Sequence, residues 1–250
     1  MTIKEYGQQN SQVVILLHGG GLSWWNYRET AEILAEQYHV ILPVLDGHAD
    51  SDRAFTTIEE NAAGIIRYID ERFSGRVLAI GGLSLGGQIA VEMLSQRPHI
   101  CRYALIESAL VKPMKLTGAM IDPSVEMSYG LIRQKWFAKM QFDYLRIRGD
   151  LFEDYYRDTC KIGKEDMKAF MKANCLYELK PILSETTAKV MVVAGSREQQ
   201  NILDSAKLLH RTIPGSRMEI LDGLYHGELS INHPQQYARM MDDLCAEERG

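Results

Sequence analysis

The sequence is poor in several kinds of residue, and each scarcity argues against a class of protein. Only 4 of its 250 residues are cysteine, and no two form a Cys-x-x-Cys pair, so neither a disulfide framework nor a bound metal is expected. The 28 basic residues are outnumbered by 33 acidic ones, so the chain lacks the positive charge of nucleic-acid-binding proteins. No apolar run approaches the roughly 18 to 20 residues needed to cross a bilayer. We therefore expect neither a nucleic-acid partner nor a membrane span.

Signals for export are also missing. The first ten residues, MTIKEYGQQN, contain neither the basic start nor the apolar stretch of a signal peptide. The four cysteines stand far apart, as free thiols in a reducing compartment often do. A chain of 250 residues, 46% of them apolar, can bury a core without disulfides. These features predict a cytoplasmic protein.

Short apolar runs alternate with longer segments of helical periodicity, such as residues 24–37 and 58–73. The short runs are continuously apolar, which is typical of strands that are covered by helices on both faces. The pattern predicts an α/β fold with a mostly parallel central sheet and helices on both of its faces. The expected strands are Val13–Leu17, Val40–Leu45, Val77–Ile80, Tyr103–Ile106, Val190–Ala194 and Met218–Leu221.

One long interval interrupts this alternation. Between the strands at 103–106 and 190–194 lie about eighty residues without a clear strand, and a structureless loop of that length is improbable in a compact domain. We therefore expect a helical insertion over 110–185, in a core made of 1–109 and 186–250. The insertion contains Trp136, four phenylalanines and six methionines. These side chains either form its own small core or also line an apolar pocket facing the sheet.

Ser84 lies in the segment Gly82-Leu83-Ser84-Leu85-Gly86, between an expected strand and an expected helix. This G-x-S-x-G pattern is weak evidence alone, because a serine among glycines can simply be a turn residue. At a strand-to-helix turn, however, it is typical of a nucleophile held in a strained conformation, with glycines that permit close backbone approach. The context therefore favours Ser84 as a candidate nucleophile.

A serine hydroxyl needs a base, usually a histidine that is oriented by a carboxylate. Of the seven histidines, His226 follows the last expected strand, so it is expected at the same edge of the sheet as Ser84. Glu198 follows the fifth strand and precedes His226 by 28 residues, the length of one helix and one strand. Glu107, at the end of the fourth strand, is the competing acid. We favour Glu198 and leave Glu107 open.

The first strong strand ends at His18-Gly19-Gly20-Gly21. These glycines either form an ordinary tight turn or supply a backbone N–H group to a developing oxyanion. In the second case Gly20 and Leu85 are the candidate donors, because the amide of Leu85 begins the helix that follows the serine. The G-x-x-x-x-G-K-[ST] pattern of a phosphate-binding loop is absent, which argues against a nucleotide site. No cofactor is expected.

Taken together, these features resemble the α/β-hydrolase family. The resemblance covers nearly the whole chain and includes the order nucleophile, acid, histidine. It implies that the insertion is a cap over the active site. Two positions depart from the family pattern. Residues 45–52 resemble a G-H-G-x-S loop but carry Ala49 at its second glycine, and Glu198 stands where aspartate is commoner.

The leading hypothesis is a serine hydrolase that cleaves an ester or related acyl bond of a small, apolar substrate. Ser84 would be the nucleophile, His226 the general base and Glu198 the residue that orients it. Because a fold does not determine a reaction, a second hypothesis is a small-molecule receptor on the same fold, with little or no turnover. In either case the partner is a small molecule, and the protein is a monomer or a homodimer.

Overall fold

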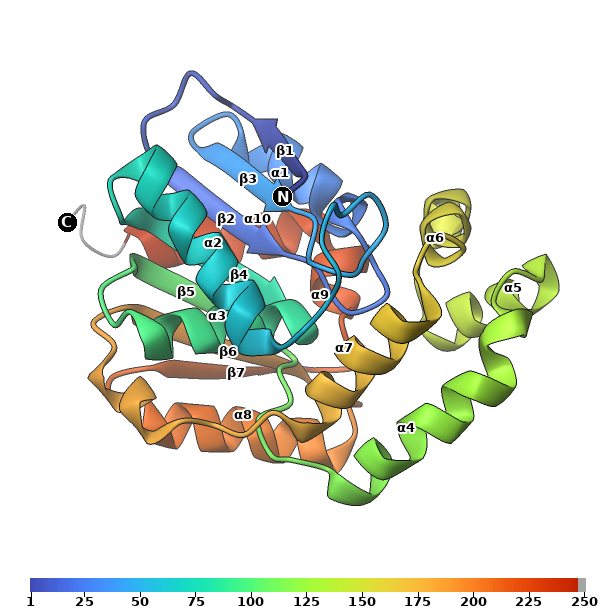
Figure 1. Cartoon of the computed structure of the whole chain (residues 1–250). Coiled ribbons are helices and arrows are strands. Elements are labelled where there is room, and N and C mark those ends of the chain that lie inside the picture. Colours follow the sequence, from blue (N-terminus) through green and yellow to red (C-terminus); the bar gives the residue numbers. More distant parts are fainter. Residues whose placement is uncertain (247–250) are drawn as a thin grey trace.

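The computed structural model describes residues 1–246 and is built around a seven-stranded sheet of order β1-β3-β2-β4-β5-β6-β7 (Figure 1). All neighbouring strands are parallel except β1, which pairs antiparallel with β3. The predicted fold class is confirmed. The strands are β1 (Ile3–Tyr6), β2 (Val13–Leu17), β3 (His39–Pro43), β4 (Val77–Leu83), β5 (Cys101–Glu107), β6 (Lys189–Gly195) and β7 (Arg217–Leu221).

All six predicted strands are present, whereas β1 was not predicted. Its sequence, IKEY, is short and mixes charged with apolar residues, because β1 is a partly exposed edge strand. The predicted strand 40–45 is shifted: β3 starts at His39 and ends at Pro43. Proline lacks the N–H group that would continue a strand ladder, which is consistent with an end at this residue.

Helices cover both faces of the sheet, with α2, α3 and α8 on one face and α1 and α10 on the other (Figure 1). Side chains of β2 alternate between the two cores: Ile15 and Leu17 join the first, and Val14 and Leu16 the second. A strand that is buried on both sides must be apolar at every position, which explains the continuous runs. The bounds are α1 (Arg28–Leu34), α2 (Ile58–Phe73), α3 (Leu85–Gln96), α8 (Gln200–Thr212), α9 (Glu228–Asn232) and α10 (Pro234–Ala246), with a 3₁₀ turn η1 (Trp24–Tyr27).

The chain between β5 and β6 contains helices joined by short connections, with no strand, and projects to one side of the sheet (Figure 1). Within it, α4 packs against α7, and α5 packs against α6. The boundaries 110 and 185 stay predictions, and residues 247–250 of the predicted core lie outside the described chain. The elements are α4 (Lys115–Ser128), η2 (Tyr129–Leu131), α5 (Lys135–Tyr144), η3 (Gly149–Leu151), α6 (Phe152–Thr159), α7 (Lys164–Leu176) and η4 (Pro181–Glu185).

The apolar side chains of the insertion do not form one core. Phe142 is buried against Phe152, with ring centroids 5.2 Å apart. Phe170 is buried instead against the ring of His48, at 4.6 Å. Trp136 and its neighbours on the outer face of α5 are exposed, so the expectation of a core role is wrong for Trp136. Because α4 packs with α7 and α5 with α6, the two helix pairs do not share one core, and the outer face of α5 stays exposed. None of the helices in residues 1–246 is both long and apolar enough to cross a membrane.

Candidate active site

Ser84 occupies the sharp turn between β4 and α3. Its backbone angles are φ 52° and ψ −112°, a combination that costs on the order of 1–3 kcal/mol for a residue other than glycine. The turn is tight because Gly86 lies against β2, where a Cβ atom would stand 2.1 Å from the carbonyl oxygen of Leu17. The N–H group of Ser84 donates to the carbonyl of Glu107, 2.9 Å away. The surrounding backbone therefore holds Ser84 in its strained conformation.

The structure brings His226 and Glu198 together. His226 lies in the turn after β7, and its Nδ1 is 2.7 Å from Oε2 of Glu198, in the turn after β6. The other carboxylate oxygen of Glu198 accepts from the hydroxyl of Ser108 at 2.6 Å and from the N–H group of Gly195 at 2.9 Å. Both oxygens of Glu198 are thus engaged, which fixes the carboxylate and leaves Nε2 of His226 facing away from it.

The contact changes the pKa values of both groups. Burial raises the pKa of Glu198, but the hydrogen bond and charge of His226, together with the hydrogen bonds from Ser108 and Gly195, outweigh burial, so the net pKa lies below its ordinary value. Burial lowers the pKa of His226, but the hydrogen bond and negative charge of Glu198, with a smaller contribution from the charge of Glu107, outweigh this effect and raise the pKa above 6.5. Each group therefore stabilises the charged form of the other.

Glu107, the competing acid, occupies a different place. It is buried, and its Oε1 accepts from the N–H group of Ser230 on α9, at 3.2 Å. Within the described chain its Oε2 has no hydrogen-bond partner. Burial raises the pKa of Glu107 to about 7. It thus lies beneath the site, bonded to α9, while Glu198 holds the imidazole.

Ser84 and His226 both line two cavities that differ in character. The first, which we call the amide-lined pocket, has a volume of about 250 Å³, and the second, the apolar pocket, has about 110 Å³. Besides Ser84 and His226, the first is lined by Leu110, Met114, Thr117, Asn174, Cys175, Gln199, Asn201 and Ile202, and the second by Gly19, Gly20, Leu22, Leu83, Leu145, Ile147, Gly227 and Ile231.

Two buried histidines hold the glycine turn after β2. The N–H group of Leu45 donates to Nε2 of His18 at 3.1 Å, and that of Gly21 donates to Nε2 of His48 at 3.0 Å. A ring nitrogen that accepts from an N–H group carries no proton, so both rings are neutral and protonated at Nδ1. Burial accordingly lowers the pKa of His18 to about 3 and that of His48 to about 4. Their role in this structure is to fix the backbone.

These contacts distinguish the three glycines of the turn. The N–H group of Gly19 donates to Oδ1 of Asn26 at 3.3 Å, and the N–H group of Gly21 donates to His48. Within residues 1–246, the N–H groups of Gly20 and Leu85 donate to no other group. Gly20 lies beside Leu85, since a Cβ atom on Gly20 would stand 3.5 Å from a Leu85 methyl carbon. The two predicted oxyanion donors are therefore neighbours with free N–H groups.

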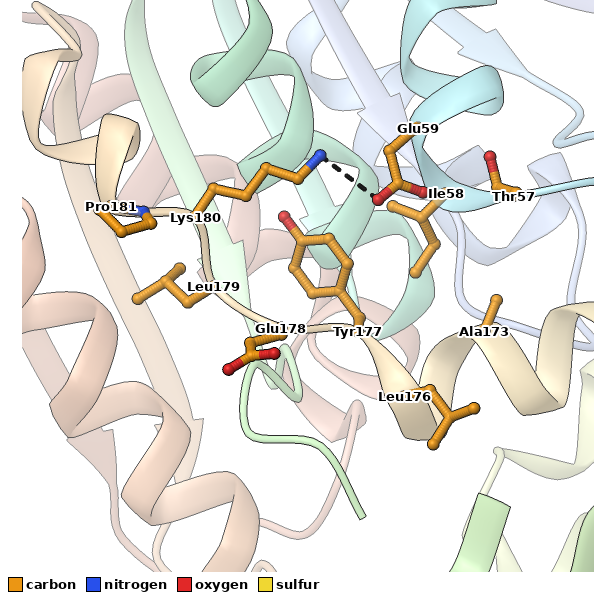
Figure 2. A pocket seen from close by; sticks show the side chains of 10 residues that line it. All are labelled: Thr57, Ile58, Glu59, Ala173, Leu176, Tyr177, Glu178, Leu179, Lys180 and Pro181. Atoms are coloured by element: carbon orange, nitrogen blue, oxygen red, sulfur yellow. Dashed lines mark ion pairs between the residues drawn. The ribbon is translucent and has the colours of Figure 1, made fainter. Parts of the chain in front are cut away.

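Another surface hollow, of about 620 Å³, lies between the start of α2 and the chain that follows α7 (Figure 2). Figure 2 shows Lys180 reaching across it to Glu59, with Nζ and Oε1 3.3 Å apart. Lys180 also pairs with the buried Glu92 of α3 at 2.6 Å, and Glu92 accepts from the Tyr177 hydroxyl at 3.1 Å. Neither Ser84 nor His226 lines this hollow. Its contacts fix the end of the insertion to the core.

Sequence reasoning missed two contributors to the site, Ser108 and Gln88. Ser108 follows β5 with a positive φ of 56°, which directs its hydroxyl to Glu198. Gln88 lies one helical turn after Ser84 and bonds to residues of the insertion. A serine after a strand and a glutamine in a helix are both common, so neither position carries a distinctive sequence signal.

The sequence matches a known protein family along most of its length. The family model described as "Alpha/beta hydrolase family" matches residues 14–240. An AB hydrolase superfamily protein of Gibberella zeae is 29% identical over 132 residues, which are 52% of this chain but only 45% of that protein. The pimeloyl-[acyl-carrier protein] methyl ester esterase of Nitrosomonas europaea is 21% identical over 94% of this chain and 96% of its own length.

Solved structures share the fold. An esterase from Exiguobacterium antarcticum superposes with a TM-score of 0.83 at 16% identity, covering 98% of this chain and 95% of the other. At this identity the likeness establishes the fold alone. The named homologue and this neighbour are both esterases. Because the family model covers most of the sequence, the chain belongs to the alpha/beta hydrolase family.

Proposed function

We propose that this protein is a serine hydrolase that cleaves the ester or related acyl bond of a small substrate, with residues 110–185 as a cap over the site. Ser84 is the nucleophile, His226 the general base and acid, and Glu198 the residue that orients the imidazole. The observation that carries the proposal is the 2.7 Å contact between His226 and Glu198 at the edge where Ser84 holds its strained turn.

In the first half-reaction, Oγ of Ser84 bonds to the carbonyl carbon of the substrate while Nε2 of His226 removes the hydroxyl proton of Ser84. The electron pair of the carbonyl moves to oxygen, and the N–H groups of Gly20 and Leu85 stabilise that oxyanion. Such donors are typically worth about 2.7–4 kcal/mol each in the transition state. The oxyanion then collapses, the bond to the alcohol oxygen breaks, and His226 protonates the departing alcohol.

The second half-reaction repeats these roles with water. His226 removes a proton from a water molecule while the oxygen of that water attacks the acyl carbon of the ester on Ser84. The bond to Ser84 breaks, His226 returns the proton to the serine oxygen, and the carboxylic acid leaves. Glu198 stabilises the imidazolium formed in both half-reactions, which agrees with the raised pKa of His226.

The test compares purified wild-type protein with Ser84→Ala on p-nitrophenyl esters of short acids. We expect turnover by wild type and a loss of at least a thousandfold in the variant, because no other group replaces the nucleophile. A fluorophosphonate probe should label wild type but not Ser84→Ala. Ser124→Ala, an exposed serine in α4, is the matched control and should behave as wild type. Equal hydrolysis by Ser84→Ala and wild type would refute the proposal.

A further inference from the structure

The two cavities that meet at Ser84 and His226 differ both in size and in polarity. Whatever is bonded to the reacting carbonyl carbon must extend into one or the other. Their linings therefore place separate limits on the two halves of a substrate.

The apolar pocket offers almost nothing for a polar group to bind. Apart from glycine backbone, Ser84 and His226, its lining consists entirely of aliphatic side chains. A hydroxyl or amide buried there without a partner would cost about 1–3 kcal/mol. The aliphatic side chains are Leu22, Leu83, Leu145, Ile147 and Ile231.

The volume of the apolar pocket limits the length of its occupant. One water-sized group fills about 30 Å³ in a liquid, so a cavity of about 110 Å³ accommodates about four heavy atoms. Two of the side chains that line the pocket, Ile147 and Ile231, are buried, at 5% and 6% exposed. Buried walls of this kind are packed and cannot easily move aside for a longer chain.

The amide-lined pocket is larger and contains polar groups. Gln199 and Asn201 line it from the start of α8, and Thr117 lines it from α4. Asn174 lines it from α7, with its side chain held in place by Gln88 at 2.8 Å. When a ligand with hydroxyl or carbonyl groups enters this pocket, the hydrogen bonds that it loses to water can be replaced by hydrogen bonds to these side chains.

Building on the proposed function, we propose that the substrates are esters of a polar alcohol with a short, unbranched or singly branched apolar acid whose acyl chain has about four carbon atoms. The acyl group remains bonded to Ser84 through both half-reactions and occupies the apolar pocket. The alcohol acquires a new hydroxyl when it departs, and apart from Ser84 and His226, which line both pockets, the polar side chains that can bond to the alcohol line only the amide-lined pocket.

The acyl half is tested with p-nitrophenyl acetate, propionate, butyrate, hexanoate and octanoate. For wild type, kcat/KM should be highest at propionate or butyrate and at least tenfold lower at hexanoate. Leu145→Ala enlarges the apolar pocket from a half-exposed position that tolerates truncation, and it should move the optimum toward hexanoate. Ile202→Ala, in the other pocket, is the matched control and should keep the wild-type optimum.

The alcohol half is tested with two esters of equal length, 2-hydroxyethyl butyrate and propyl butyrate. The hydroxyl-bearing ester should have a kcat/KM at least threefold higher in wild type. Asn201→Leu should reduce or abolish this preference while the acyl profile is retained.

The outcomes separate this inference from the function on which it rests. If wild type hydrolyses none of the esters and resists the fluorophosphonate probe, both fail. If it hydrolyses octanoate as fast as butyrate, or if Leu145→Ala leaves the acyl profile unchanged, the assignment of the acyl group is wrong although the hydrolase stands. A preference for propyl butyrate would refute the polar-alcohol half in the same way.

Discussion

Gln88 of α3 and Asn174 of α7 exchange two hydrogen bonds of 2.8 Å, one from each side-chain amide. The amide nitrogen of Gln88 also donates to the carbonyl of Leu110, at 2.5 Å. Leu110 begins the chain that leads into the insertion, and Asn174 lies near its end. One fully buried side chain thus joins the helix that follows Ser84 to both segments that connect the insertion to the core.

We predict that Gln88→Leu destabilises the protein by about 1–3 kcal/mol, because Asn174 and the carbonyl of Leu110 lose their buried partner. Urea denaturation measures the change. Asn174→Ala and the double variant complete a cycle, for which we expect a coupling energy of at least 0.5 kcal/mol. Gln236→Leu, an exposed position in α10, is the control and should stay within about 0.5 kcal/mol of wild type. Additive single changes would contradict the bridging role.

The strained turn makes a steric prediction about Gly86. In Gly86→Ala the new Cβ atom would stand 2.1 Å from the carbonyl oxygen of Leu17, so the backbone of α3 or β2 must shift. We expect a loss of about 1–3 kcal/mol or more in thermal or chemical denaturation. Gly130→Ala is the matched control, since nothing lies within 4 Å of its Cβ position, and it should be neutral or slightly stabilising. Equal stability of the two variants would be inconsistent with this geometry.

A pH dependence follows from the pair formed by Glu198 and His226. The imidazole must be neutral to act as a base, and its pKa is raised, so kcat/KM should fall as the pH drops through a value above 6.5. Glu198→Gln removes the negative charge, so the pKa of His226 should fall and the acidic limb should move to lower pH. We also expect the maximal rate to decrease by about 10²–10⁴-fold.

The histidine titration can be measured without turnover, by NMR of the imidazole of His226. In wild type the midpoint should lie above 6.5, and in Glu198→Gln it should lie lower. Glu185→Gln, an exposed change outside the site, is the control. An unchanged midpoint in Glu198→Gln would show that this carboxylate does not stabilise the imidazolium.

The buried carboxyl group of Glu107 should affect the stability of the protein rather than its activity. Burial raises the pKa of Glu107 from 4.5 to about 7, so as the pH rises the carboxyl loses its proton at lower pH in the unfolded state than in the native state. The native state therefore loses stability as the pH rises from about 4.5 to about 7. The loss between pH 5 and 8 should be on the order of 3 kcal/mol, and Glu107→Gln should avoid it. Urea denaturation at several pH values measures the difference. Glu219→Gln, an exposed change on β7, should follow wild type at every pH.

Much of the framework was determined by the sequence alone. Apolar runs identified six strands: the five interior strands, which are covered on both faces and so have few positions for a polar side chain, and the edge strand β7, whose run Met218–Leu221 is interrupted only by Glu219. The order of the runs also placed Ser84, Glu198 and His226 after strands that end at one edge of the sheet. The edge strand β1 escaped this reasoning since a half-exposed strand needs no continuous apolar run.

Only the tertiary structure decided which acid contacts His226. Glu107 ends β5 and Glu198 follows β6, so the sequence favoured Glu198 by its spacing but left Glu107 open. In the structure Glu107 accepts a hydrogen bond from α9, whereas Glu198 contacts the imidazole. The neutral state of His48, the free N–H group of Gly20 and the sizes of the two pockets were likewise absent from any local pattern. The physical reason is that these features depend on contacts between residues far apart in the sequence. Periodicity records each segment's burial, whereas contacts between distant residues depend on backbone turns that form only when the sheet is assembled.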